Sequence, residues 1–449
     1  MIVLKFGGTS VGTAESRKQV VEIITKKNES KIVVLSAVSG TTNALVSIGK
    51  FFNDKKNSDA FVKIDSLYEN YTQLIGKLYK TDNYKTKAIN FVFQVFETIK
   101  NLSKSSFTKK EELILLAQGE ILSTNLVQLY LEESQISSTL ISALDFMKID
   151  DNGEPNSEII ANNLYPILEE NPKQNLWITQ GFICKNTENN IDNLQRGGSD
   201  YTASLIGAAI NAKEIQIWTD IDGMHNNDPR FVENTFSIEE ISFDEAAELA
   251  YFGAKILHPQ SLIPAKENNI PVLLKNTFNP KDKGTIIKNK TVNNGFTAVA
   301  AKDGITAIKI KSYRMLMAYG FLKNVFEVFE KNQTPIDMIT TSEVAVSLTI
   351  DNNSKLKEIV SELESFGKVE VDNNLSIICV AGDFSQNNEG INAKVFNALK
   401  NIPVRMISYG GSNYNISLLV KSTDKIAALN SLNSGLFKEK YLLSEAIEM

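Results

Sequence analysis

The sequence is poor in the residues that bind metals or form disulfides, with two cysteines and two histidines among 449 residues. Cys184 and Cys379 lie too far apart to form a metal-binding or redox motif. Two histidines are also too few for a zinc site. We therefore expect no protein-bound metal site.

Long apolar runs and basic blocks are missing as well. No segment approaches the ~18 consecutive apolar residues of a membrane span. The N-terminus lacks the charged stretch and following apolar stretch of a signal peptide. The formal net charge is −6, which argues against nucleic acid or an anionic membrane as a partner. We expect a cytoplasmic location.

The chain is long enough for two or three domains, since ~100–200 residues is usual for one. Its first distinctive stretch is KFGGTSVG at residues 5–12, which follows an apolar strand at 1–4. Glycines let backbone N–H groups approach a ligand, and phosphate oxygens are suitable acceptors. Because Lys5 precedes the glycines, this is not a P-loop. Taken alone, the stretch is equally consistent with an ordinary glycine turn.

A second strand is expected at 32–38, followed by the polar turn SGTTN at 39–43 and a helix from Ala44. Strand, glycine turn and helix form the repeating unit of an α/β sheet, whose ligands bind at the carboxyl ends of the strands. Residues 51–112 show helical periodicity and are expected to form peripheral helices without a chemical role.

A helix expected at 111–133 places Glu120 on its apolar stripe. An unpaired carboxylate is costly in a core, so the pattern favours a residue that receives a ligand's ammonium group. The alternative is a glutamate that reaches solvent at the end of a helix.

A strand at 176–184 precedes LQRGGSDYT at 194–202 and a helix at 203–212. Two glycines and a Ser-Asp cap before a helix form an anion site from backbone N–H groups and the helix dipole. Arg196 can hold a carboxylate through two hydrogen bonds. Asp200 can also be explained as a simple N-cap, but capping requires neither the glycine pair nor the arginine.

A further strand at 215–220 leads into a loop at 221–230, and another strand is expected at 271–275. Between them, the helix at 246–257 is interrupted at Gly253 and carries Lys255. This lysine can be placed near phosphates or can be simply solvated.

Seven motifs together resemble the aspartate kinases and stand in that family's order along essentially the whole chain. They are KFGGTS (5–10), QGE (118–120), QGF (180–182), RGGSDYT (196–202), WTD (218–220), DPR (228–230) and FGAK (252–255). The resemblance implies an amino-acid-kinase fold at 1–290, an α/β sandwich with a mostly parallel sheet. The sequence departs from many relatives at His225, where they carry a tyrosine near the nucleotide, which puts that purine contact in doubt.

From about residue 300 the pattern becomes a repeat of ~70 residues with the order βαββαβ. The two copies, at 304–372 and 373–449, resemble paired ACT domains, which are small amino-acid sensors. The second copy lacks a final strand, and residues 296–301 could supply it and interlock the copies.

The resemblance implies ATP with Mg²⁺ as cofactor and transfer of a phosphoryl group to L-aspartate, giving 4-phospho-L-aspartate for lysine, threonine and methionine biosynthesis. The β-carboxylate is already ionised at neutral pH, so no general base is needed and positioning must carry the catalysis. We assign catalysis to Lys5 and Asp200, with Asp200 orienting Lys5 or helping to organise Mg²⁺. Substrate binding is assigned to Thr42, Glu120, Arg196 and Ser199, and ATP binding to Lys5, Phe6, Gly7, Gly8, Thr219, Asp220, His225, Arg230 and Lys255.

The segment PIDMITTSE at 335–343 resembles the effector site of lysine-inhibited aspartate kinases. Strand-end polar residues that face water are the alternative reading of this segment. Sensor repeats of this type usually pair across a twofold axis, so we expect a homodimer or a dimer of dimers. The expected effector contacts are Met315, Phe321, Ile336, Asp337, Ser342 and Glu343.

Two other functions remain open at this point. A sister kinase of the same fold, acting on acetylglutamate or a nucleotide, would share the glycine turns but is not expected to have QGE or the repeat. A non-catalytic amino-acid sensor could lose Lys5, Arg196 and Asp200, and all three are present. Too few residues follow the repeat for a fused homoserine dehydrogenase, so we expect a monofunctional enzyme.

Overall fold

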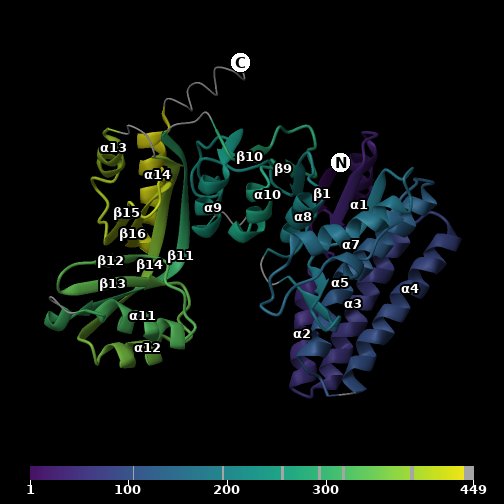
Figure 1. The fold of residues 1–449 in the computed structure, drawn as a ribbon, viewed down its shortest axis with the longest axis horizontal. Helices are drawn as coiled ribbons and strands as arrows, with labels where there is room; N and C mark the ends of the chain where they lie inside the picture. The colour runs from purple at the N-terminus through teal and green to yellow at the C-terminus, as the bar shows by residue number, and fades with distance from the viewer. Residues whose placement is uncertain are drawn as a thin grey trace. The chain divides into compact units, whose positions relative to one another are not determined.

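The computed structural model describes residues 1–104, 106–194, 197–253, 257–291, 295–315, 319–384 and 389–438. They form two compact units (Figure 1). The first unit comprises Met1–Met224 and Leu257–Lys290, and the second comprises His225–Ile256 and Thr291–Met449. Both units combine helices with β-sheets, and the predicted α/β class is confirmed.

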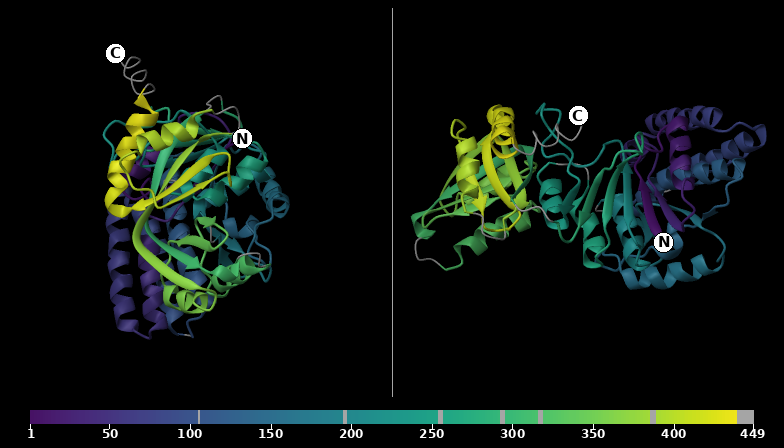
Figure 2. Two further views of the ribbon diagram at one scale, coloured as in Figure 1. Left: turned by 90° about the vertical axis from the view of Figure 1, so that its left-hand side faces the viewer. Right: turned by 90° about the horizontal axis from the view of Figure 1, so that it is seen from above.

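The first unit contains a mostly parallel sheet, whose strands are visible side by side in Figure 2. The pairs from β3 to β9 are parallel, and β10 is antiparallel to β9. In order across the sheet the strands are β3 (Thr139–Leu140), β4 (Leu176–Gln180), β2 (Lys31–Leu35), β1 (Ile2–Phe6), β7 (Ile215–Thr219), β9 (Val272–Asn276) and β10 (Thr285–Lys288).

Helices cover the first unit's sheet, and the long α3, α4 and α5 run alongside one another (Figure 1). Apolar stripes on α2 to α5 close a core of their own, which explains the helical periodicity of residues 51–112. The helices are α1 (Ala14–Thr25), α2 (Thr41–Asn53), α3 (Asn57–Leu78), α4 (Asp82–Asn101), α5 (Lys109–Glu133), α6 (Ala143–Phe146), α7 (Ser157–Glu169), α8 (Gly198–Ala209) and α10 (Ile263–Glu267). A two-stranded sheet pairs β5 (Ile183–Lys185) with β6 (Ile191–Asn193).

The second unit contains an antiparallel sheet in the order β12-β13-β11-β14-β16-β15. One core lies under α11 and α12, and a second lies under α13 and α14. The elements are β8 (Glu240–Ser242), α9 (Phe243–Tyr251), β11 (Gly295–Lys311), α11 (Phe321–Lys331), β12 (Ile339–Thr341), β13 (Ala345–Ile350), α12 (Leu356–Leu363), β14 (Lys368–Asp383), α13 (Ile391–Ala398), β15 (Met406–Tyr409), β16 (Asn415–Lys421) and α14 (Lys425–Leu436).

Two strands of this sheet run through both copies of the repeat. β11 has 17 residues and β14 has 16, and they pair along their lengths with register shifts near the start of β11 and near its middle. Residues 296–301 pair with the part of β14 that begins the second copy. The two copies are therefore joined inside one sheet.

Several boundaries differ from the expected ones for local reasons. The expected strand at 176–184 is split into β4 and β5, because Phe182 has a φ of +68° that no strand residue adopts. Helix α2 begins at Thr41, directly after Gly40 with a φ of +83°. Helix α8 begins at Gly198, so Asp200 lies in its first turn and is not the N-cap. No helix in the described ranges is long and apolar enough to cross a membrane.

Candidate active site

The glycine turn follows β1, whose side chains alternate between the two faces of the sheet. Leu4 and Phe6 pack with α1 and α5, so Lys5 points to the opposite face, which α8 covers. Its ammonium group lies 2.7 Å from the carboxylate of Asp200. Both side chains keep a small exposed fraction, 11% for Lys5 and 17% for Asp200. The structure thus brings the two predicted catalytic residues together at the carboxyl end of β1.

The two predicted glycines differ in what their amides do. The N–H of Gly7 donates to the carbonyl of Trp218 at 3.1 Å, so it extends the pairing of β1 with β7. The N–H of Gly8 donates to no group within the described residues. A Cβ on Gly8 would lie 3.0 Å from the carbonyl oxygen of Ala37, which explains the need for glycine there. Gly8 is therefore the amide with a donor to offer a phosphate.

Phe6 serves the core and not a ligand. Its ring is fully buried and stacks on Trp218 with 5.8 Å between the centroids. Any contact of Phe6 with a nucleotide would have to come from its backbone.

Glu120 lies on α5 with 4% of its surface exposed. Oε1 accepts a hydrogen bond of 3.2 Å from the amide of Ala37, and Oε2 is buried without a partner among the described residues. Burial raises the pKa of Glu120 to about 8, although the hydrogen bond from the backbone amide of Ala37 opposes the shift. An ammonium group bound beside this buried carboxyl group would stabilise its ionised form.

No role is assigned to Gln180 and Phe182 from the sequence, but they contact the helices that carry assigned residues, α5 and α8. Gln180 accepts from the amide of Ala143 at 2.8 Å and donates to Thr124 at 2.9 Å, one helical turn after Glu120. The strained Phe182 donates its N–H to Thr202 of α8 at 2.8 Å. The signal was present in the motif QGF, because a glycine that ends a buried strand indicates a sharp turn.

The substrate-binding residues Thr42 and Ser199 both lie in the first turns of helices, α2 and α8. Ser199 is buried beside Gly181, where a Cβ would lie 2.8 Å from the Cα of Ser199. Thr42 is half-buried. Arg196 lies outside the described residues.

The predicted nucleotide-binding residues are divided between the two units. Thr219 and Asp220 follow β7 in the first unit, and the Thr219 hydroxyl donates to Asp220 at 3.1 Å. In the second unit, His225 lies 3.4 Å from the hydroxyl of Thr235. Arg230 is exposed and paired with Asp228 at 2.6 Å, a hydrogen-bonded pairing that raises the pKa of Arg230. Lys255 lies outside the described residues.

The comparisons with known proteins now decide the family. Residues 1–276 match the model of the Amino acid kinase family, and residues 378–436 match an ACT domain. The chain is 33% identical to lysine-sensitive aspartokinase 3 of Escherichia coli, over 98% of this chain and 99% of that protein. It is 34% identical to the chloroplastic aspartokinase 1 of Arabidopsis thaliana, over 97% and 80% respectively.

The chain belongs to the aspartokinase family. The predicted ATP-dependent phosphorylation of aspartate, regulated by an amino acid, is confirmed at the level of this family. The solved structure of E. coli aspartokinase III with aspartate and ADP, in the R-state, has a TM-score of 0.83 at 32% identity. The T-state complex of that enzyme with lysine and aspartate has a TM-score of 0.82 at 32% identity. Both comparisons cover 97% of this chain, with 100% and 99% of the respective relatives.

The aspartokinase effector residues predicted from the sequence all lie in the second unit, but they have different environments. Phe321 is buried and Ile336 packs against the same core. Met315 is half-buried. Ser342 and Glu343 are exposed in the turn between β12 and β13, and neither contacts Asp337 by a hydrogen bond or ion pair within the described residues.

Asp337 is the exception, because its carboxylate is 3% exposed and already paired. Lys302 contacts it at 2.8 Å, and the hydroxyl of Tyr251 donates to it at 2.9 Å. Lys302 also contacts Asp351 at 2.8 Å and lies 4.5 Å from the centre of the Tyr251 ring. Burial opposes the charged form, but the two carboxylates outweigh it and raise the pKa of Lys302. The second oxygen of Asp337 has no partner within the described residues.

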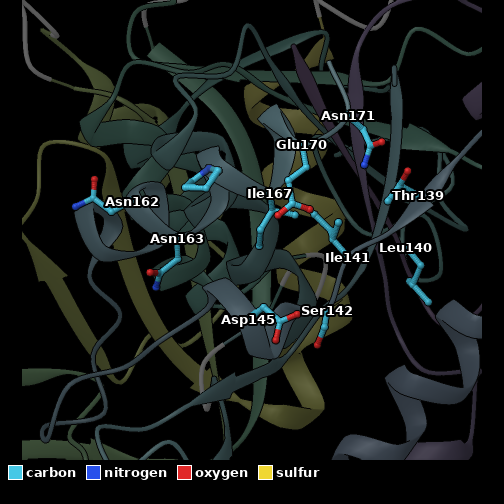
Figure 3. A pocket seen from close by; sticks show the side chains of 11 residues that line it. Thr139, Leu140, Ile141, Ser142, Asp145, Asn162, Asn163, Ile167, Glu170 and Asn171 are labelled. Carbon is cyan, nitrogen blue, oxygen red and sulfur yellow. The ribbon is translucent and has the colours of Figure 1, made fainter. Parts of the chain in front are cut away.

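Two cavities of the aspartokinase's first unit are large enough for small molecules. One of about 320 Å³ adjoins the glycine turn and the start of α2, and its lining includes Gly12, Ser39 and Thr41. The other, of about 560 Å³, lies between β3 and α7 (Figure 3). No predicted site residue is among the lining residues of either cavity. The candidate active site is therefore defined by the contacts around Lys5, Asp200 and Glu120.

Proposed function

We propose that the first unit transfers the γ-phosphoryl group of ATP to the β-carboxylate of L-aspartate with Lys5 as the central cation. The observation that carries this proposal is the 2.7 Å contact between Lys5 and Asp200 beside the glycine turn. The pair holds an ammonium group at the place where a phosphoryl group would meet the amide of Gly8, which donates to no group in the described part of the chain. Fixed positive charge aimed at a transferring phosphoryl group lowers the barrier without a general base.

Glu120 and Arg196 are proposed to orient aspartate. The buried carboxyl of Glu120 would receive the α-ammonium group, and its Oε2, which has no partner among the residues that the structure describes, supports this role. Arg196 would hold the α-carboxylate, with Thr42 and Ser199 as further contacts. This arrangement leaves the β-carboxylate to face the phosphoryl group.

The nucleotide is proposed to bind with Mg²⁺, which supplies charge neutralisation on the phosphates. The described residues contain no group of three or more His, Cys, Asp or Glu side chains that could hold a metal. That finding is compatible with Mg²⁺, because this ion is usually held by substrate phosphates and one or two carboxylates. Asp200 is the carboxylate at the glycine turn that could take part.

The second unit is proposed to sense an amino acid, and L-lysine is our candidate. Asp337 and Glu343 are the carboxylates for its ammonium groups, and lysine-sensitive aspartokinase 3 of E. coli is a relative at 33% identity. We further propose a catalytic domain at 1–290, ACT domains at 304–372 and 373–449, a homodimer or dimer of dimers, and a cytoplasmic location.

An ATP-dependent hydroxamate assay tests the substrate assignment. Aspartate, glutamate and acetylglutamate are offered separately, and we expect hydroxamate only with aspartate. Turnover of acetylglutamate alone would indicate the sister kinase. Binding of amino acids without any turnover would indicate a sensor that has lost catalysis.

A further inference from the structure

Arg17 is a fully buried cation in helix α1 that has no role in the site described above. No carboxylate pairs with it within the described residues, and the ionisable groups nearby are the hydroxyls of Tyr79 and Tyr71, which burial keeps neutral. Burial lowers the pKa of Arg17 from its ordinary value, but a guanidinium remains charged in proteins. Its charge is therefore balanced by neutral dipoles.

The guanidinium of Arg17 joins two segments that are far apart in sequence. Nε donates to the carbonyl of Val11 at 3.0 Å, and Val11 belongs to the glycine turn. Nη1 donates to the carbonyl of Ser123 at 3.3 Å, and Ser123 lies in α5 close to Glu120. Because a guanidinium is planar and rigid, the two hydrogen bonds fix the separation of these carbonyls.

Stability alone does not explain this residue. A buried cation without a carboxylate partner costs free energy, and Nη2 has no hydrogen-bond acceptor among the described residues. An apolar side chain of similar volume would fill the same space without that cost. The arrangement instead suits a residue that sets the relative position of two ligand-binding segments.

We propose that Arg17 is a positioning residue for phosphoryl transfer. It holds the glycine turn, which receives the phosphates, at a fixed position relative to the helix whose Glu120 receives the aspartate ammonium. The reacting carboxylate and phosphorus are thereby aligned, an effect that acts on turnover more than on the binding of either substrate. This inference rests on the proposed function of Lys5 and Glu120.

Lys31 provides a matched control. It is also a buried cation, with 3% of its surface exposed, and it donates to two carbonyls, those of Ile24 at 2.8 Å and Lys27 at 2.6 Å. The Ile24 carbonyl lies in the last turn of α1 and the Lys27 carbonyl lies just after the helix, and Lys31 begins β2, away from the carboxyl ends of the strands. Lys31→Met removes a similar buried interaction without touching the glycine turn or α5.

The experiment compares Arg17→Met, Arg17→Lys and Lys31→Met in the full chain. Steady-state kinetics give kcat, and calorimetry gives the Kd of aspartate and of a non-hydrolysable ATP analogue separately. We expect Arg17→Met to lose about 100-fold in kcat, the scale of a misplacement of ~1 Å, while each Kd changes less than about threefold. Lys31→Met is expected to lower Tm and leave kcat within about twofold.

Arg17→Lys covers the case in which the methionine variant does not fold. It keeps the buried charge but replaces the rigid fork by a single flexible ammonium, so its kcat is also expected to fall. In Arg17→Ala, methylguanidinium added to the assay is expected to restore part of the lost kcat, and methylammonium is not.

Wild-type kcat in a folded Arg17→Lys or Arg17→Met variant would overturn the inference. So would an equal loss of kcat in Lys31→Met, or a loss that appears only as weaker substrate binding. Absence of aspartate-dependent turnover in the wild type is a separate outcome, because it would refute the proposed function itself.

Discussion

The ammonium group of Lys302 lies 2.8 Å from the carboxylate of Asp337, so the carboxylate predicted to bind an effector already holds an ammonium from its own chain. Tyr251, the last residue of α9, donates to the same carboxylate oxygen. An effector's ammonium group must therefore either displace Lys302 or use the second oxygen of Asp337. The first route would break an ion pair that shares its carboxylate oxygen with Tyr251 of α9.

We predict that Lys302→Met makes the enzyme more sensitive to lysine. Removing the internal ammonium leaves the buried Asp337 carboxylate with the Tyr251 hydroxyl but without Lys302, a costly state that an effector's ammonium would relieve. The lysine concentration that half-inhibits aspartate phosphorylation should fall about tenfold, equivalent to ~1.4 kcal/mol. The measurement is inhibition by lysine, with threonine and methionine as control amino acids.

Lys425→Met is the matched control, because Lys425 pairs with Asp303 at 2.7 Å in the same unit. Its inhibition should match the wild type. Unchanged inhibition in Lys302→Met would contradict competition for Asp337, and a fully sensitive Glu343→Ala would remove Glu343 from the effector site.

A second prediction concerns Lys5. Lys5→Met should lower kcat by at least about 100-fold, because a cation aimed at the transferring phosphoryl group is lost. Asp200→Asn keeps the Lys5 ammonium group but removes the carboxylate that orients it, so the loss of kcat in this variant should be smaller. Hydroxamate formation measures both variants, with circular dichroism as the check on folding. Near-normal turnover in Lys5→Met would exclude Lys5 from the mechanism.

The third prediction is that aspartate binding releases protons from Glu120. Its pKa of about 8 in the ligand-free protein exceeds the ordinary value of 4.5, so the carboxyl is neutral at pH 7. A bound ammonium favours the ionised form and should release about one proton per site. Calorimetry in buffers of different ionisation enthalpy at pH 7 counts these protons. Glu120→Gln should abolish the release and weaken aspartate binding, with little change for ATP.

The raised pKa also predicts the pH dependence of stability. A raised pKa in the folded state means that the contribution of Glu120 is full below pH 4.5 and is lost as the pH rises through about 8. The Tm of the ligand-free wild type should therefore decrease more over this pH range than the Tm of Glu120→Gln. Saturating aspartate should reduce the difference. Parallel Tm curves for the two proteins would show that Glu120 titrates normally.

The fourth prediction concerns the close approach of Gly181 to Ser199. Gly181→Ala places a Cβ 2.8 Å from the Cα of Ser199, so backbone must move. We expect a loss of ~1–3 kcal/mol in the free energy of unfolding and weaker aspartate binding. Gly76→Ala is the control, since nothing lies within 4 Å of a Cβ there and alanine favours the helix. Urea denaturation and the KM for aspartate distinguish the two variants.

Much of the secondary structure can be predicted from the sequence, because these features have local physical causes. Glycine placement indicates the turn after β1. Periodicity indicates that Glu120 lies on the buried face of its helix and that strands and helices alternate after residue 300. The start of α8 was misplaced because a left-handed Gly197, with a φ of +70°, takes the capping position expected of Asp200.

Contacts between residues that are distant in the sequence cannot be predicted from local patterns. Lys302 in β11 pairs with Asp337, which lies 35 residues later in the chain. The sequence around each residue does not indicate which partner it has. Arg17 has only a weak signal in the sequence. It stands three and four residues before Val20 and Val21 on α1, so helical spacing places the cation on the buried face.

The long strands β11 and β14 have a consequence for how this regulatory half can be dissected. A cut between residues 372 and 373, at the predicted start of the second copy of the repeat, would sever β14 in mid-sheet. The broken end would expose unpaired backbone groups of β11, a template for aggregation. The duplication is therefore not a pair of detachable modules. Deleting the predicted second copy to obtain an unregulated enzyme would leave the first half of β11 without its partner strand, so single substitutions are the practical way to alter feedback.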